Sequence, residues 1–180
     1  MPLETPTLYA GDCVLRPWRL EDAAALREAC GDEGICRFTT VPRIYSPHAA
    51  TQWIRRQLVH AAAGTAIVLA IVRVGDQRPV GMIGLFGLDH GERTARFGYW
   101  VIARARRQGL ATNAAEALAR WAFASLALET IFIDCDPTNA ASARVAEHLG
   151  ATLAGSRLLR ADGLEVELER HALTRAVARR

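Results

Sequence analysis

The chain has 180 residues, of which 51% are hydrophobic and 23% are charged, and its formal net charge is +3. This length and composition predict a single globular domain over residues 1–180. The small net charge argues against a protein that coats nucleic acid. No run of roughly 18 uncharged apolar residues is present, so no membrane-spanning helix is expected. The N-terminus lacks the basic and apolar segments of a signal peptide, which makes a cytoplasmic location the expectation.

The first half of the chain changes from helical to strand periodicity. Apolar residues recur at intervals of three and four in its helices, whereas β-branched runs between turn residues mark its strands. The predicted elements are a strand near Tyr9–Arg16, helices over Leu20–Ala29 and Pro47–Ala63, with a Gly/Pro-containing loop between the two helices, and strands over Ala66–Val74 and Val80–Leu88, with a turn at Gly75–Pro79.

The second half alternates strands and helices. The predicted elements are a strand over Arg96–Ile102, a helix over Thr112–Leu126, a strand over Thr130–Cys135, a helix over Ala140–Leu149, and two strands over Thr152–Leu159 and Glu165–Leu173 that join across Ala161–Gly163. Strands that are both consecutive and separated by helices indicate a mixed sheet with helices on its faces. The fold class is therefore α+β.

Residues 103–113, ARARRQGLATN, are a basic turn that runs into a helix, and all 22 basic residues of the chain are arginine. Backbone N–H groups at such a helix start can bind phosphate. A Walker loop needs a lysine, and the dinucleotide fingerprint needs a second glycine, so neither is present. No aromatic series accompanies the arginines, as single-stranded nucleic acid would require. The pyrophosphate of coenzyme A stays open, and so does an ordinary surface turn.

The four cysteines form no CxxC pair and have no histidine at zinc-ligand spacing. We therefore interpret them as small core residues and expect no metal site.

The stretch FGYWVIARARRQGLATNAAEALARWAF, followed by DPTNAASARVAEHLG, resembles the GNAT superfamily of acetyl-CoA-dependent N-acetyltransferases. It is most similar to the Rim-type branch, the ribosomal-protein-alanine N-acetyltransferases, in which a G-Y-W strand, an R/Q-x-x-G-x-G/A loop, a long helix and N-x-x-S occur in this order. The similarity begins at LRPWRLEDAAAL and covers nearly the whole chain. It implies a mixed, mostly antiparallel sheet of six to seven strands, with helices on both faces and a splayed central strand pair.

The resemblance also implies a donor site for acetyl-CoA. The pantetheine arm would lie between the strands Tyr99–Ile102 and Ile131–Cys135. Main-chain groups around Trp100, Val101 and Ile102 would pair with it, and a backbone N–H there would polarise the thioester carbonyl. The residues implied for the pyrophosphate loop are Arg106, Arg107, Gln108, Gly109, Leu110, Ala111 and Thr112.

Asn139 and Ser142 match the N-x-x-S of the branch. Asn139 is predicted to cap its helix and, by the resemblance, to face the pantetheine. Ser142 would protonate or hydrogen-bond the leaving sulfur. In many members of the superfamily a tyrosine four residues further along serves as the acid, and this chain has Ala146 there.

The chain departs from the family pattern at Arg96, where a glutamate that helps to deprotonate the amine is common. Substitute bases would come from acids near the acceptor end, and Glu167 is the candidate we name first, ahead of Asp89, Asp134 and Glu165. Deprotonation through water is the alternative.

We therefore expect direct acetyl transfer from acetyl-CoA to a primary amine, because no nucleophile motif for an acyl-enzyme is visible. The acceptor suggested by the branch is the N-terminal α-amine of a ribosomal or other protein. The alternatives are a small-molecule acetyltransferase acting on an antibiotic, amino acid or polyamine, and a non-catalytic acyl-CoA-binding sensor. The last strand is a candidate homodimer edge, and no nucleic acid or membrane partner is expected.

Overall fold

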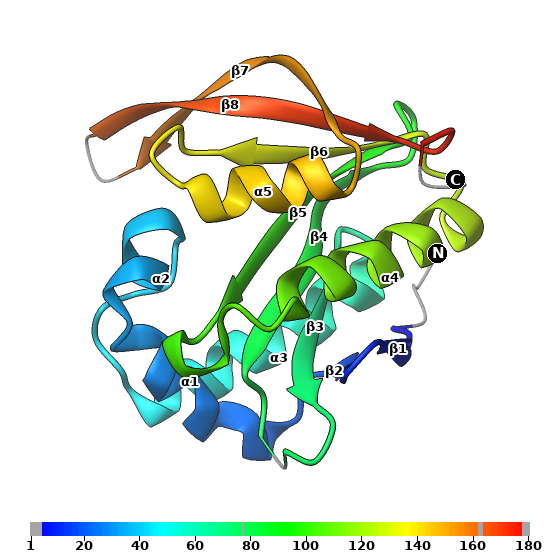
Figure 1. The fold of residues 1–180 in the computed structure, drawn as a ribbon. Coiled ribbons are helices and arrows are strands. Elements are labelled where there is room, and N and C mark those ends of the chain that lie inside the picture. The colour runs from blue at the N-terminus through cyan, green and yellow to red at the C-terminus, as the bar shows by residue number, and fades with distance from the viewer. Residues whose placement is uncertain (1–4, 77, 162–163, 178–180) are drawn as a thin grey trace.

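The computed structural model describes residues 5–76, 78–161 and 164–177, which form one open sheet in the strand order β1-β2-β3-β4-β5-β6-β8-β7 (Figure 1). The strands are β1 Leu8–Ala10, β2 Cys13–Pro17, β3 Ala66–Arg73, β4 Gly81–Asp89, β5 Thr94–Val101, β6 Thr130–Cys135, β7 Thr152–Ala161 and β8 Leu164–Thr174. The α-helices are α1 Ala23–Cys30, α2 Glu33–Phe38, α3 Pro47–Ala63, α4 Leu110–Ser125 and α5 Ala140–His148. Short 3-10 turns, η1 Leu20–Asp22 and η2 Ala103–Ala105, precede α1 and α4.

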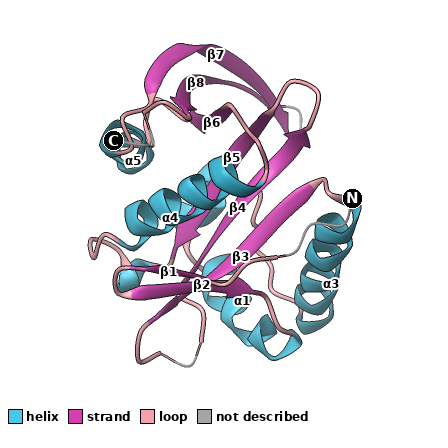
Figure 2. Ribbon diagram, turned by 90° about the vertical axis from the view of Figure 1, so that its right-hand side faces the viewer, coloured by secondary structure: helices cyan, strands magenta, loops and turns pink. Residues whose placement is uncertain are grey.

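Helices cover both faces of this sheet. Figure 2 shows α4 and α3 on opposite sides of the strands, and α3 packs on β3 while α4 packs across β1 to β5. The pair β5–β6 is parallel, and the other described strand pairs are antiparallel. The predicted α+β class with a mostly antiparallel mixed sheet is confirmed.

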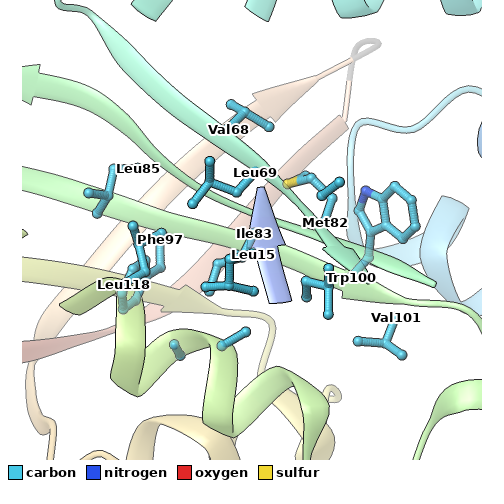
Figure 3. Close-up of a cluster of buried hydrophobic side chains, with 14 of the residues drawn as sticks. Leu15, Val68, Leu69, Met82, Ile83, Leu85, Phe97, Trp100, Val101 and Leu118 are labelled. Atoms are coloured by element: carbon cyan, nitrogen blue, oxygen red, sulfur yellow. The ribbon is translucent and has the colours of Figure 1, made fainter. Parts of the chain in front are cut away.

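One layer of the core lies between the sheet and α4, and a second layer, which includes the fully buried Ile54, lies between the sheet and α3. The buried face of α4 is rich in alanine, which lets the helix approach the strands closely, and its Leu118 packs beside Phe97 of β5 (Figure 3). Leu118 is fully buried. Its truncation to alanine would cost about 2–5 kcal/mol of the free energy of unfolding.

The N-terminal strand differs from the sequence prediction. The predicted single strand Tyr9–Arg16 is two strands that turn back on each other, with Ala10 opposite Cys13. Gly11 occupies the turn with φ of 57°, a conformation that glycine adopts without strain. This extra strand gives a sheet of eight strands rather than six to seven.

Helix α2 lies in a segment that we predicted to be a loop. It has 6 residues, it contains Gly34, and its N-cap Asp32 accepts a hydrogen bond from Ile35 N–H. Ile35 is 3% exposed. Such a short helix depends on tertiary packing, so periodicity does not reveal it.

The central parallel pair separates part of the way along, as predicted. β5 and β6 are paired from Thr94↔Thr130 to Phe97↔Ile133, and beyond that point no pairing joins them. The end of β5 and the end of β6 therefore border an opening in the sheet, which we call the β5–β6 opening. Of the predicted turns, Gln77 and residues 162–163 lie outside the described residues.

Candidate active site

A cleft of about 1250 Å³ lies at the β5–β6 opening, between the starts of α4 and α5 and the side of α2. Ten of the residues that the resemblance implies line this cleft. They are Trp100, Val101, Arg106, Arg107, Gly109, Leu110, Ala111, Thr112, Asn139 and Ser142. The predicted residues Ile102, Gln108 and Glu167 do not line it.

The start of α4 presents backbone donors to the cleft. Gly109 is the N-cap with φ of 71°, and Arg107 also has a positive φ, of 63°. Among the described residues, no acceptor takes up the backbone N–H groups of residues 107–111. These donors at the N-terminus of a 16-residue helix form a concave site for an anion.

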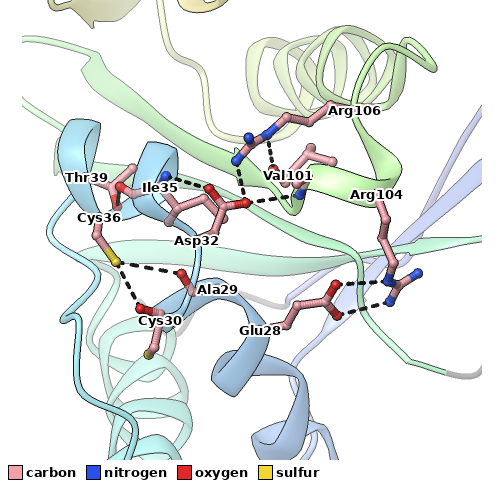
Figure 4. Close-up of polar contacts among 11 residues, drawn as sticks. Glu28, Ala29, Cys30, Asp32, Ile35, Cys36, Thr39, Val101, Arg104 and Arg106 are labelled. Atoms are coloured by element: carbon pink, nitrogen blue, oxygen red, sulfur yellow. Dashed lines mark hydrogen bonds and ion pairs between the residues drawn. The ribbon is translucent and has the colours of Figure 1, made fainter.

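Arg106 has a different contact from the one we predicted. Its Nη2 donates to Asp32 Oδ2 at 2.7 Å and its Nε donates to the Val101 carbonyl at 2.8 Å (Figure 4). Asp32 Oδ2 also accepts from Ala103 N–H at 3.0 Å. Arg106 therefore ties the loop before α4 to the start of α2 through its Nε and one Nη2 donor.

The pKa of Asp32 reflects this arrangement. Burial raises the pKa, but hydrogen bonds from Arg106 and from the Ile35 and Ala103 N–H groups outweigh burial, so the pKa lies below its ordinary value. The carboxylate is thus charged at neutral pH and holds Arg106 in place. We call this contact the Asp32–Arg106 latch.

Gln108 and Arg104, which lie close to Arg106 in the sequence, contact residues outside the cleft. Gln108 Oε1 accepts from Arg73 Nη1 at 3.0 Å, which directs its amide away from the cleft. Arg104 pairs with Glu28 at an exposed position, 2.9 Å apart (Figure 4). Arg107 lines the cleft and makes no ion pair among the described residues, so its guanidinium is available to a ligand.

Only some of the peptide groups at the end of β5 face the β5–β6 opening, where they could hydrogen-bond a ligand. Ile102 N–H donates to Val80 on the β4 side, and the Ile102 carbonyl accepts from Ala105. Because hydrogen-bonded residues alternate along an antiparallel pair, Trp100 also directs its peptide groups toward β4. This direction does not favour the predicted pairing of the Trp100 and Ile102 peptide groups with the pantetheine arm, which stays a prediction. Tyr99 and Val101 direct their peptide groups toward the opening instead.

The side chain of Trp100 lies in the core. It is 5% exposed, and its ring packs against Trp18 with centroids 6.3 Å apart.

Ser142 is part of a small group of polar side chains at the opening. Its Oγ lies 2.8 Å from Tyr99 Oη and 3.2 Å from Cys135 Sγ, and either partner can donate in each pair. Asn139 caps α5 as predicted, and its Oδ1 accepts from Ser142 N–H at 3.2 Å. Burial raises the pKa of Tyr99 well above its ordinary value and also raises that of Cys135. Tyr99 thus keeps its proton near neutral pH.

The acids proposed as bases are engaged elsewhere. Glu167 lies in the β7–β8 hairpin, where its Oε1 accepts from Ser156 Oγ at 2.6 Å, so the structure separates it from the cleft. Asp89 accepts from the Gly91 and Glu92 N–H groups, and Glu165 pairs with Arg160. Asp134 is paired with Arg157 and Arg170. None of the four belongs to the cleft lining.

Sequence reasoning missed two features of the cleft. The wall formed by α2, which includes Ile35, Phe38 and Thr39, fell in a predicted loop. The contact between the Tyr99 hydroxyl and Ser142, which joins residues 43 positions apart, was not predicted. The acidic N-cap Asp32 was the available signal for α2, and the sequence carries no signal for the Tyr99 contact.

The sequence profile of the acetyltransferase (GNAT) domain matches residues 12–152 of the chain. This match runs from β2 through α5 and includes all the residues that line the cleft, whereas β1, β8 and nearly all of β7 lie outside it. The chain therefore belongs to the GNAT acetyltransferase family, which confirms the family resemblance and the acyltransferase class of activity.

Solved structures share the fold. RimJ from Mycobacterium smegmatis, in complex with CoA-disulfide, is 24% identical with a TM-score of 0.79, over 99% of this chain and 92% of that one. RimL, a ribosomal L7/L12 alpha-N-protein acetyltransferase in complex with coenzyme A, is 18% identical with a TM-score of 0.83, over 94% and 98%. The Microcin C7 self-immunity acetyltransferase MccE, in complex with acetyl-CoA and AMP, is 19% identical with a TM-score of 0.82, over 91% and 93%.

No helix in the described part of the chain is long and apolar enough to cross a membrane. The described residues also contain no group of three or more His, Cys, Asp or Glu side chains placed to hold a metal ion.

Proposed function

We propose that this acetyltransferase uses acetyl-CoA as its donor and transfers the acetyl group directly to a primary amine at the β5–β6 opening. The observation that carries this proposal is the position of the opening beside the unpaired N–H groups at the start of α4. The first feature fits an extended arm that adds to a strand edge, and the second fits a pyrophosphate. Gly109 and the α4 N-terminus supply most of the phosphate contacts, with Arg107 as the charged side chain.

The edge of β5 would hold the arm and the thioester. The Tyr99 peptide groups and the Val101 N–H would pair with the arm, whereas the Val101 carbonyl already accepts from Arg106 Nε. An N–H group there would stabilise the negative charge that develops on the thioester oxygen. The amine nitrogen forms the new bond to the carbonyl carbon, and the carbon–sulfur bond then breaks. Holding the two reactants together supplies much of the rate.

Ser142 would donate its proton to the departing thiolate, and Tyr99 replaces it or orients the hydroxyl. Their 2.8 Å separation and the protonated state of Tyr99 support this relay. The ammonium group of the acceptor loses its proton to water, because the four candidate acids are engaged outside the cleft.

We propose a protein N-terminal α-amine as the acceptor, in the cytoplasm. The Rim-type resemblance and the names of RimJ and RimL support this choice. A small-molecule amine is the second candidate, because the similar MccE is a self-immunity acetyltransferase.

Two measurements test the donor and the reaction separately. Isothermal titration calorimetry should show acetyl-CoA binding, and CoA release should follow with at least one member of a panel of N-terminal peptides, polyamines and amino acids. Absence of acetyl-CoA binding would contradict the proposal. Binding without CoA release from any amine would favour an acyl-CoA sensor instead.

A further inference from the structure

Two arginines hold one carboxylate on the sheet face that points away from α4 and α5, and a third arginine lies on the same face. Asp134 accepts from Arg170 through Nε at 2.8 Å and Nη2 at 3.1 Å, and from Arg157 Nη1 at 3.3 Å. Arg96 of β5 points to the same face, because its neighbour Phe97 packs toward α4, and its guanidinium lies against Gly87 of β4. The charges of Arg157, Asp134 and Arg170 all affect the pKa of Arg96. We call Arg96, Arg157, Arg170 and Asp134 the arginine patch.

The arginine patch has more positive than negative charge. Both oxygens of Asp134 are taken by Arg157 and Arg170, and Arg96 makes no hydrogen bond or ion pair among the described residues. Burial, followed by repulsion from Arg157, lowers the pKa of Arg96. A partly buried guanidinium without a counterion is unfavourable, so this surface favours an anion.

The arginine patch borders the β5–β6 opening. Asp134 follows Ile133, the last residue of β6 that pairs with β5. Successive side chains of a strand point to opposite faces, so Asp134 and Cys135 lie on opposite sides of the sheet. Cys135 contacts Ser142 on the α5 side. Ser142 and the arginine patch therefore lie on opposite faces of the sheet, next to the adjacent β6 residues Cys135 and Asp134.

The face that carries the arginine patch is accessible. The helix on that side, α3, packs on β3, whereas α4 and α5 contact β5 and β6 from the other side. The side chains of Arg157 and Arg170 are 31% and 26% exposed. An acceptor that reaches the opening from this face would pass over the three guanidiniums.

We propose that the acceptor is an amine with a carboxylate close to it, and that the arginine patch binds this carboxylate while the amine enters the β5–β6 opening. This inference rests on the proposed function and specifies its acceptor. Two sources share the chemistry: an acidic side chain among the first residues of a protein N-terminus, and the free carboxylate of an amino acid. We expect Arg96 to contribute most to this selectivity, because it has no carboxylate partner among the described residues.

The test compares matched acceptors with the full chain and acetyl-CoA. Peptides of one scaffold carry Asp, Gln or Lys at the second and third positions, and free amino acids are compared with their amides. CoA release gives kcat/KM for each, at low and at high salt. Where a pair of acceptors is acetylated, we expect kcat/KM at low salt to be at least about tenfold higher for the acidic acceptor. This preference should decrease at high salt, because salt screens the charges.

Arg96→Gln should reduce the preference at least threefold, mainly through KM of the acidic acceptor. The matched control is Arg160→Gln, which removes the same charge from an exposed pair with Glu165 in the β7–β8 hairpin and should leave the preference unchanged. If Arg96→Gln does not fold, as judged by circular dichroism, Arg157→Gln and the salt series provide the same comparison.

The outcomes separate this inference from the proposed function. Acetyl transfer with equal kcat/KM for acidic, neutral and basic acceptors would overturn the acceptor class and leave the reaction intact. A preference that survives Arg96→Gln and high salt would also overturn it. Preference among peptides alone would identify a protein N-terminus as the source, and preference among amino acids alone would identify the free carboxylate. Binding of acetyl-CoA without transfer to any acceptor would contradict the proposed function as well.

Discussion

The two sides of the β5–β6 opening are built from different groups. On the side of α4 and α5, the cleft is formed by backbone N–H groups, small residues such as Gly109 and Ala111, and a few hydroxyls. On the opposite side, the arginine patch presents charged side chains around one buried carboxylate. Under the two proposals, donor recognition would depend on backbone conformation, whereas acceptor recognition would depend on side-chain charge.

The largest effect is expected for Gly109→Asp, which tests the role of the backbone N–H groups at the start of α4 in binding acetyl-CoA. Aspartate tolerates positive φ, so the chain should fold, but its carboxylate would compete for the N–H groups at the start of α4 and repel phosphate. We expect KM for acetyl-CoA to rise about 100-fold, equivalent to about 3 kcal/mol. Steady-state kinetics with varied acetyl-CoA would measure it.

The matched control is Gly75→Asp. Gly75 also has a positive φ, of 91°, and nothing lies within 4 Å of the position of an added Cβ. This variant should keep the wild-type KM. Equal effects of the two substitutions would show that the loss at Gly109 reflects backbone strain rather than phosphate binding.

Ser142→Ala tests the role of the Ser142 hydroxyl, which contacts the Tyr99 hydroxyl at the β5–β6 opening. Turnover should fall about 30-fold with acetyl-CoA affinity retained, since the leaving thiolate loses its proton donor. Tyr99→Phe should lower turnover by a smaller factor, and the double variant should resemble Ser142→Ala because the two hydroxyls act as one unit. Stopped-flow CoA release and calorimetry would separate turnover from affinity. Fully additive effects would contradict the relay.

The Asp32–Arg106 latch ties α2 to the loop before α4 on the cleft side, and its disruption should have the smallest effect on activity. Asp32→Asn should raise KM for acetyl-CoA about fivefold and lower the free energy of unfolding by about 1–2 kcal/mol at neutral pH. Because the pKa of Asp32 is lowered in the folded state, its contribution is present above about pH 4 and is lost as the pH falls through the folded pKa.

Urea unfolding at several pH values would measure this effect. The acid-dependent loss of stability should be smaller in Asp32→Asn than in the wild type. Glu28→Gln is the control, because it removes the neighbouring but exposed pair with Arg104 and should change stability by less than about 0.5 kcal/mol. An equal loss in both variants would show that the latch has no special role.

The sequence predicted most of the fold and the donor side of the site. Periodicity located α3, α4, α5 and the long strands, and the motif residues Gly109, Asn139 and Ser142 meet in one cleft. These features depend on local patterns, which one chain displays directly. The hairpin at Gly11 and the helix α2 were missed because a two-residue turn and a six-residue helix carry little periodicity.

The contacts that decide individual roles could not be predicted. Arg106 appeared to be a phosphate ligand until its partner Asp32, 74 residues away, was placed beside it. Glu167 appeared to be a base until the β7–β8 hairpin paired it with Ser156. Such roles depend on tertiary distances between remote residues, and the sequence gives only the residue types.

The most direct test of the central claim is mass spectrometry of an acidic N-terminal peptide incubated with the chain and isotope-labelled acetyl-CoA. The account predicts that one labelled acetyl group appears on the α-amine, at a rate that Ser142→Ala reduces about 30-fold and Gly109→Asp reduces further at limiting acetyl-CoA. Absence of label on every peptide and small amine tested, in a sample that calorimetry shows to bind acetyl-CoA, would contradict it.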